Sequence, residues 1–127
     1  PKPQNPIDMK LLKKLNKMRL IFMRHGETFN NLLAAISPEA YNSRRVNEPP
    51  MSKQGKESTL LTGQKMKELG FSFDKIICAA HYRSLESAKL LRQGFGNETL
   101  PIELFLKCHE IGGVYEGDRM FPGLTKK

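Results

Sequence analysis

The apolar positions of this chain fall into three short runs, separated by longer stretches in which apolar and polar residues mix. Residues 20–23 read Leu-Ile-Phe-Met, and comparable runs occupy about 75–79 and about 102–107. Short apolar runs of this kind are typical of strands that are buried on both faces of a sheet. The sequence therefore predicts three buried strands.

The stretches after these runs carry signals for helices. Ser52 is a good N-cap, and Gly70 supplies a stop signal for the helix that Ser52 would start. Gly94 and Gly96 would end a later helix in the same way. Three helices are predicted: one beginning near residues 28–31, one over about 53–69 and one over about 83–93.

The order strand, helix, strand, helix, strand indicates βαβ units. Such units build an α/β fold with a mostly parallel sheet and helices on its faces, here three layers. Open parallel sheets bind ligands at the carboxyl ends of their strands. We therefore expect polar residues that follow the three strands to meet at one edge of the sheet.

The N-terminal part of the chain has a different character. Residues 1–19 are predicted to be a basic leader, and residues 20–127 the folded domain. Within the leader, residues 9–18 place Leu11, Leu15 and Met18 on one helical face with lysines elsewhere. Such a helix could lie on an anionic membrane surface, although packing on its own domain is the simpler interpretation.

Composition narrows the class of protein. The 127 residues carry a formal net charge of +8, which favours anionic partners. No aromatic residues alternate with the basic cluster, so nucleic acid is not an expected partner. No apolar run approaches the roughly 20 residues of a transmembrane segment. The sequence shows no export signal, and we expect Cys78 and Cys108 to be buried thiols. We therefore predict an intracellular, cytoplasmic protein, with an organelle as the alternative compartment.

The residues that follow the strands suit chemistry on a phosphate group. His25 can act as a base or a nucleophile. Arg24 and Arg83 can bind phosphate oxygens through their planar guanidinium groups. Glu110 is a candidate acid, provided burial raises its pKa. Thr28 and Asn31 could add neutral hydrogen bonds to the same anion.

Four blocks of the sequence resemble the histidine phosphatase superfamily, also called phosphoglycerate-mutase-like. The first block is LIFMRHGETFNN, which fits an apolar strand followed by R-H-G-E-[ST]-x-x-N. The second, PPMSKQG, supplies Ser52 and Gly55. The third, CAAHYRSLESA, places Arg83, Ser87 and Ala88 at family positions but departs from the family at residues 78–80. The fourth is HEIGGVYEG, which begins at His109 and Glu110.

The resemblance implies a phosphoglycerate-mutase-like fold and a phosphatase or phosphoryl transferase that works through a phosphohistidine intermediate. By that resemblance His25 is the phosphoacceptor, Arg24 and Arg83 bind the phosphoryl group, and Glu110 is the general acid. Thr28 and Asn31 are lesser candidates for the phosphate pocket. No metal or organic cofactor is implied. The expected substrate is a phosphorylated small molecule or a phosphoprotein.

The resemblance also predicts a second pocket histidine, which the chain does not supply. The histidines are His25, His81 and His109, and none follows a late apolar strand as the family pattern requires. We therefore expect residues 20–127 to be the N-terminal portion of the domain. The alternative is a non-catalytic subunit, which would bind a phosphorylated ligand or play a structural role among other protein subunits.

The polar stretch over residues 37–50 is predicted to be a long loop near the site. It contains Arg44 and Arg45, which could contact a second anionic group of a substrate. A solvent-exposed loop without a ligand is the simpler interpretation. The identity of the substrate does not follow from the sequence.

Overall fold

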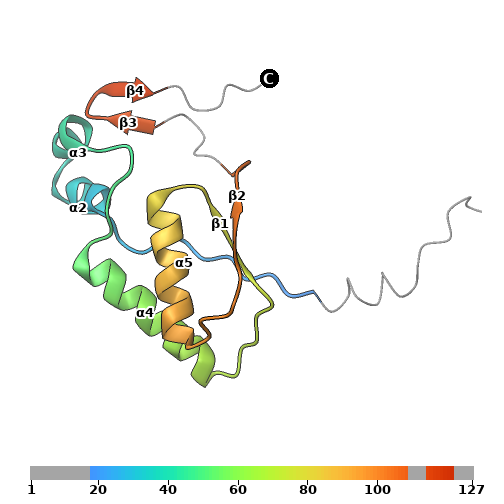
Figure 1. Ribbon diagram of the computed structural model, residues 1–127. Helices are drawn as coiled ribbons and strands as arrows, with labels where there is room; N and C mark the ends of the chain where they lie inside the picture. Colours follow the sequence, from blue (N-terminus) through green and yellow to red (C-terminus); the bar gives the residue numbers. More distant parts are fainter. Residues whose placement is uncertain (1–17, 109–113, 122–127) are drawn as a thin grey trace, which may run out of the picture.

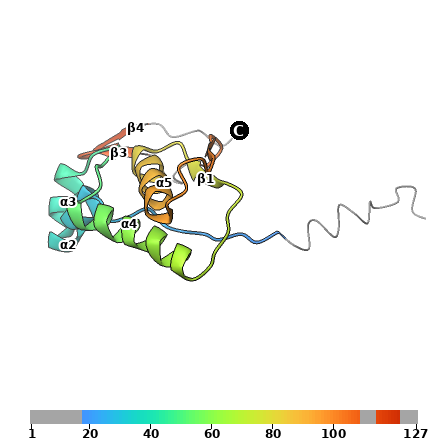
Figure 2. The same ribbon diagram turned by 60° about the horizontal axis from the view of Figure 1, so that its bottom comes forward.

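The computed structural model describes residues 18–108 and 114–121 (Figure 1). Two long helices lie side by side and pack closely, and a parallel pair of strands runs alongside the second of them. Two short helices lie together at one end of the domain, next to a hairpin, in both views (Figures 1 and 2). The elements are α2 (Phe29–Ile36), α3 (Pro38–Arg44), α4 (Lys53–Glu68), β1 (Ile76–Ala79), α5 (Tyr82–Phe95), β2 (Ile102–Phe105), β3 (Val114–Glu116) and β4 (Arg119–Phe121).

The predicted α/β class is confirmed by the unit β1–α5–β2. The strands β1 and β2 are parallel neighbours, with Ile76 opposite Ile102 and Ala79 opposite Phe105. A parallel pair needs a crossover connection, and α5 provides it. The strands predicted over about 75–79 and 102–107 are therefore found, with slightly shorter bounds.

The helix α4 begins at the predicted cap, and α5 ends at Gly96 as predicted, but Gly94, which was also expected to end α5, lies inside that helix. The side chain of Ser52 accepts a hydrogen bond from the backbone N–H of Gly55 at 2.9 Å, which caps α4. Gly96 ends α5 with a left-handed φ of 70°. The two helices approach so closely that a Cβ atom at Gly94 would collide with the carbonyl oxygen of Leu60.

The core is small and lies where α4, α5 and β1 meet the turn before α2. Among the described residues the buried apolar side chains are Leu33, Met51, Cys78, Ala88, Leu91 and Leu100. Cys78 is thus buried as expected. Cys108 is exposed, so the prediction of two buried thiols was wrong for this residue.

The strand predicted over residues 20–23 is not formed. This segment belongs to no helix or strand, it makes no backbone hydrogen bond with another described residue, and Phe22 is 91% exposed. An apolar run has the preference for a strand, but a strand also needs a neighbour whose N–H and C=O groups are available. Among the described strands, β1 pairs with β2 alone.

Two further elements differ from the sequence prediction. The stretch 37–50 is not one loop, because α3 occupies its first half. The Ser37 side chain accepts a hydrogen bond from Ala40 N at 3.0 Å, and Pro38 stands at the first helical position, so the segment carries a start signal that its polarity obscured. The hairpin β3–β4, which turns at Gly117, was not predicted.

Residues 9–17 of the predicted basic helix lie outside the described residues. None of the helices in the described ranges has both the length and the apolar character needed to span a bilayer.

Candidate functional site

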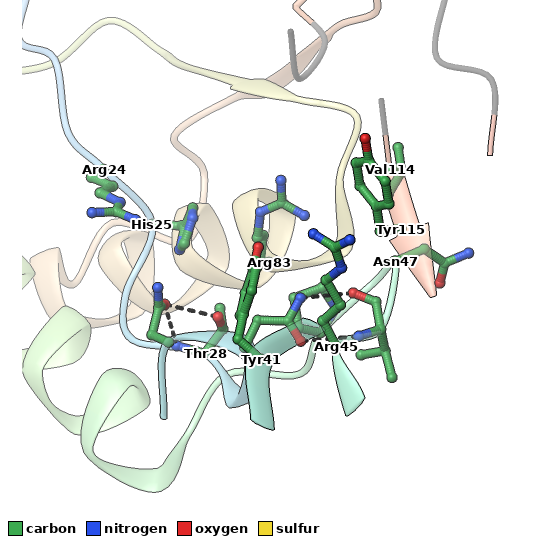
Figure 3. Close-up of a pocket in the computed structure, with 13 residues that line it drawn as sticks. Arg24, His25, Thr28, Tyr41, Arg45, Asn47, Arg83, Val114 and Tyr115 are labelled. Carbon is green, nitrogen blue, oxygen red and sulfur yellow. Dashed lines mark hydrogen bonds between the residues drawn. The ribbon is translucent and has the colours of Figure 1, made fainter. Parts of the chain in front are cut away.

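A pocket of about 130 Å³ lies where the turn after residues 20–23 meets the N-terminal ends of α2 and α5 (Figure 3). The loop after α3 and the strand β3 complete its wall. The described residues that line it are Arg24, His25, Thr28, Asn30, Asn31, Tyr41, Arg45, Val46, Asn47, Pro49, Arg83, Val114 and Tyr115. Five of the six predicted site residues therefore line one pocket, although the roles assigned to them stay predictions.

The ring of His25 has a defined orientation. Its Nδ1 atom lies 2.8 Å from the carbonyl oxygen of Gly26. Because a carbonyl oxygen only accepts hydrogen bonds, this contact requires the proton on Nδ1. In the neutral ring the lone pair then belongs to Nε2, which is the nitrogen that could react with an electrophile.

The turn that carries His25 is fastened to α5. The backbone N–H of Gly26 donates to Oγ of Ser87 at 3.1 Å, and the Ser87 hydroxyl donates to the carbonyl oxygen of Arg83 at 2.8 Å. Ser87 is 3% exposed, so this bridge lies in the interior. It fixes the position of the His25 turn relative to the helix that supplies Arg83.

Glu27 belongs to the same sequence block but is not among the described residues that line the pocket. Its carboxylate accepts a hydrogen bond from Oγ of Ser52 at 2.5 Å, and its carbonyl oxygen accepts from Ser52 N at 2.9 Å. A Cβ atom at Gly55 would collide with the backbone of Glu27. Glu27 therefore joins the turn to the start of α4, which explains the pairing of these two blocks.

Thr28 and Asn31 are bonded to each other. Oδ1 of Asn31 accepts hydrogen bonds from Thr28 N at 2.9 Å and from Thr28 Oγ1 at 2.8 Å (Figure 3). Thr28 is 1% exposed. Both groups line the pocket, but the Thr28 hydroxyl proton already has an acceptor in the cap of α2. Of these two side chains, the Asn31 amide nitrogen is the donor group that has no hydrogen-bond partner among the described residues.

Two arginines lie on either side of His25 in the close-up view (Figure 3). Arg83 is the second residue of α5 and is 9% exposed, whereas Arg24 is exposed. The N-terminal end of a helix carries positive potential, and Arg83 adds a full charge there. No described lining residue is a carboxylate, so this part of the pocket attracts anions.

His81 does not line the pocket. Its Nδ1 atom lies 3.1 Å from Oε1 of Glu48, and Oε2 of the same carboxylate accepts a hydrogen bond from Tyr82 N at 2.7 Å. Glu48 thereby caps α5 from another segment, since the His81 side chain makes no cap hydrogen bond. This contact also holds the loop after α3 against the start of α5, which contributes Arg83 to the pocket lining.

The remaining predicted acid, Glu110, lies outside the described residues, as does His109. Among the described side chains no group of three or more histidine, cysteine or acidic residues could hold a metal ion.

Several pocket residues were not found from the sequence. Asn30 forms a pair of hydrogen bonds with the backbone of Val46, at 2.8 Å and 3.0 Å, which holds the loop after α3. Tyr41 and Tyr115 come from α3 and β3, and the Arg45 guanidinium lies over both of their rings. These two tyrosines lie outside the motif around His25, so no sequence motif marked them as pocket residues. In this region the sequence pointed only to Arg44 and Arg45.

No family model matches the chain. Solved structures that are similar to part of it include the following three. YhfR from Bacillus stearothermophilus shares 22% identity at a TM-score of 0.49, and a candidate alpha-ribazole-5'-P phosphatase from Escherichia coli shares 22% at 0.46. The product of the open reading frame Rv3214 from Mycobacterium tuberculosis shares 27% at 0.42.

These likenesses are partial. They cover 65%, 65% and 62% of this chain, respectively, but 35% of each matched structure. The chain thus spans about a third of the length of the structures it matches. It resembles the histidine phosphatase superfamily through its own sequence blocks, whose residues the structure gathers around His25.

Proposed function

We propose that this chain carries the phosphate site of a histidine-phosphatase-like enzyme, which cleaves phosphate monoesters through a phosphohistidine on His25. The supporting observation is the state of the His25 ring. Its Nδ1 proton is committed to the Gly26 carbonyl oxygen, and its side chain lines a pocket between Arg24 and Arg83. A neutral imidazole held in this tautomer can attack through Nε2.

The arginines would stabilise the phosphoryl group as it is transferred. A guanidinium group binds two phosphate oxygens at once, and its charge offsets the negative charge of the three equatorial oxygens. Arg83 is mostly withdrawn from water, where such a charge acts more strongly than at the surface. Arg24 is more exposed and would close the open side of the site.

The proposed reaction has two steps. In the first, Nε2 of His25 forms a bond to phosphorus while the bond to the ester oxygen breaks, and Glu110 gives that oxygen a proton. In the second, water attacks the phosphohistidine and gives a proton to the Glu110 carboxylate, so that inorganic phosphate leaves and both the imidazole and the acid form of Glu110 are regenerated. In a mutase an acceptor hydroxyl would take the place of water. Neither step requires a metal ion or an organic cofactor.

The substrate would be a phosphorylated small molecule or a phosphoprotein, and the pocket charge agrees with either. The cytoplasm is the compartment that we propose for this reaction.

The test is turnover of p-nitrophenyl phosphate by the intact natural protein. His25→Ala should lower kcat below about one thousandth of the wild-type value, because the nucleophile is lost. Arg83→Met should lower it by about 100-fold or more. Lys89→Met removes an exposed cation from the same helix and serves as the matched control, with unchanged activity.

Trapping the intermediate tests the chemistry directly. Labelled substrate should leave an acid-labile, alkali-stable label on wild-type protein and none on His25→Ala. A wild-type protein that neither turns over substrate nor becomes labelled would contradict the proposal.

A second candidate function is a non-catalytic subunit that binds phosphorylated ligands. It is favoured by the fact that His25 is the one imidazole among the described lining residues. This alternative predicts that inorganic phosphate raises the melting temperature of the protein although no turnover occurs. Loss of that shift in Arg83→Met would place the ligand in this pocket.

A further inference from the structure

Arg45 is held by hydrogen bonds through both its side chain and its backbone. Its Nε atom donates to the carbonyl oxygen of Gly117 at 2.9 Å, and its own carbonyl oxygen accepts from Gly117 N at 2.7 Å. These two bonds connect the residue after α3 to the turn of the β3–β4 hairpin. The next residue, Val46, is fixed by Asn30.

The guanidinium group of Arg45 also lies over two aromatic rings. Its Cζ atom lies 3.8 Å from the ring centroid of Tyr115 and 5.2 Å from that of Tyr41. Rings at these distances attract the cation and restrict its rotation. The Arg45 side chain is thus already ordered in the ligand-free protein, so a ligand that binds it loses little free energy to side-chain ordering.

The terminal amino groups of Arg45 keep their hydrogen-bonding capacity. They form no hydrogen bond or ion pair with any residue in the described ranges, although the side chain lines the pocket. Figure 3 shows the guanidinium of Arg45 in the same pocket as that of Arg83, at the wall formed by Tyr115. The neutral side chain of Asn47 lines the pocket from the same loop.

We propose that Arg45 forms a second anion subsite, so that the preferred substrate is a phosphate monoester with another anionic group near its far end. This inference rests on the proposed function for the position of the first phosphate, which Arg24 and Arg83 would hold. A preorganised guanidinium with two open donors binds a carboxylate or a second phosphate in a bidentate manner. A substrate with a neutral or cationic end would bind without an ionic partner for the Arg45 guanidinium.

The alternative is that Arg45 only attaches the hairpin to α3. The two roles separate in a set of ligands that differ at one end: ethyl phosphate, phosphoglycolate and phosphoethanolamine, whose ends are neutral, anionic and cationic. Affinities are measured by calorimetry in the His25→Ala background of the intact protein, so that no ligand is consumed. Arg45→Met is compared with Arg44→Met, which removes an exposed cation at the end of α3 outside the pocket lining.

With Arg45 present, phosphoglycolate should bind about 10- to 100-fold more tightly than ethyl phosphate, and phosphoethanolamine more weakly than either. Arg45→Met should remove this preference and change the affinity for ethyl phosphate by less than about threefold. Arg44→Met should keep the preference. Arg45→Lys should restore part of it, because the charge returns without the planar fork.

The inference is overturned if Arg45→Met weakens all three ligands equally, if phosphoglycolate has no advantage with Arg45 present, or if none of the three binds. The order of the three affinities needs no Arg45 variant, so an unfolded Arg45→Met does not prevent the test. Absence of phosphatase turnover in the protein with His25 intact would contradict the proposed catalysis, while the binding preference would still decide the role of Arg45.

Discussion

The backbone N–H of Gly26 donates a hydrogen bond to Oγ of Ser87, which lies 61 residues further along the chain. This contact joins the turn that carries His25 to the helix that carries Arg83. The two groups proposed to act on one phosphate are therefore positioned through a single interior hydroxyl. The importance of Ser87 is mechanical, since its side chain is not among the lining residues of the pocket.

Replacing Ser87 by Ala should weaken both the fold and the site. The N–H of Gly26 would lose its acceptor inside the protein, which costs about 1–3 kcal/mol of unfolding free energy. Because the His25 turn would no longer be fixed, kcat should fall by about 10-fold or more. Urea denaturation and p-nitrophenyl phosphate turnover measure the two effects.

The control for this experiment is Ser58→Ala. Ser58 also donates its hydroxyl to a carbonyl oxygen one turn back, but on the exposed side of α4. Its loss should change the unfolding free energy by less than about 0.5 kcal/mol. Equal effects of both substitutions would show that the bridge to Gly26 has no special role.

Replacing Glu48 by Ala should loosen the start of α5. The carboxylate accepts the hydrogen bond from Tyr82 N at 2.7 Å, and loss of such a cap costs about 1 kcal/mol. Glu48→Gln keeps an acceptor oxygen for Tyr82 N and should lose less than half as much. Faster hydrogen exchange at the Tyr82 amide in Glu48→Ala, but not in Glu48→Gln, would identify the cause.

Replacing Gly94 by Ala should disturb the packing of α4 against α5. The new methyl group would overlap the carbonyl oxygen of Leu60, and backbone cannot move aside as a side chain can. We expect the unfolding free energy to fall by about 3 kcal/mol. Gly70→Ala is the comparison, because Gly70 has open space around it and a φ of 75°, so its cost is backbone strain of about 1 kcal/mol. A larger loss in Gly70→Ala than in Gly94→Ala would contradict the packing described here.

The two cysteines should differ in reactivity toward iodoacetamide. Burial raises the pKa of the Cys78 thiol, because the charged thiolate is disfavoured away from water. Cys108 is exposed. Mass spectrometry at pH 8 should therefore find Cys108 labelled first. Labelling of Cys78 should rise at higher pH, because more of the thiol is ionised there. The folded state is also less stable at higher pH, because the thiol has a lower pKa in the unfolded chain and loses its proton more readily there. Equal labelling rates in the native protein would contradict the assigned burial.

The sequence was sufficient for those elements whose signals are local. The cap at Ser52 and the glycines at the ends of α4 and α5 fixed these helices, and the short apolar runs located β1 and β2. The segment 20–23 shows the limit of this approach. Its composition favours a strand, but pairing depends on a partner that composition cannot reveal.

The sequence predicted that His25 and Arg83 would meet, on the expectation that each follows a strand of one parallel sheet. Arg83 does follow β1, whereas the segment before His25 forms no strand, and the His25 turn is joined to α5 through Gly26 and Ser87 instead. Glu27 and Ser87 were recognised as motif positions without roles, because those roles are contacts between distant segments. Tyr115 was missed since it stacks on a residue far away in the chain. These contacts depend on packing, for which a single sequence carries no periodic signal.

The bonds between Arg45 and Gly117 join residues that are 72 positions apart. Closing so long a loop costs entropy before the contact returns any stabilisation, so this wall of the pocket should form late in folding. During translation, the segment with His25 is synthesised well before the β3–β4 hairpin, which forms part of the pocket wall. An anion that bridges Arg45 and Arg83 would then stabilise this wall once the hairpin has joined the His25 turn.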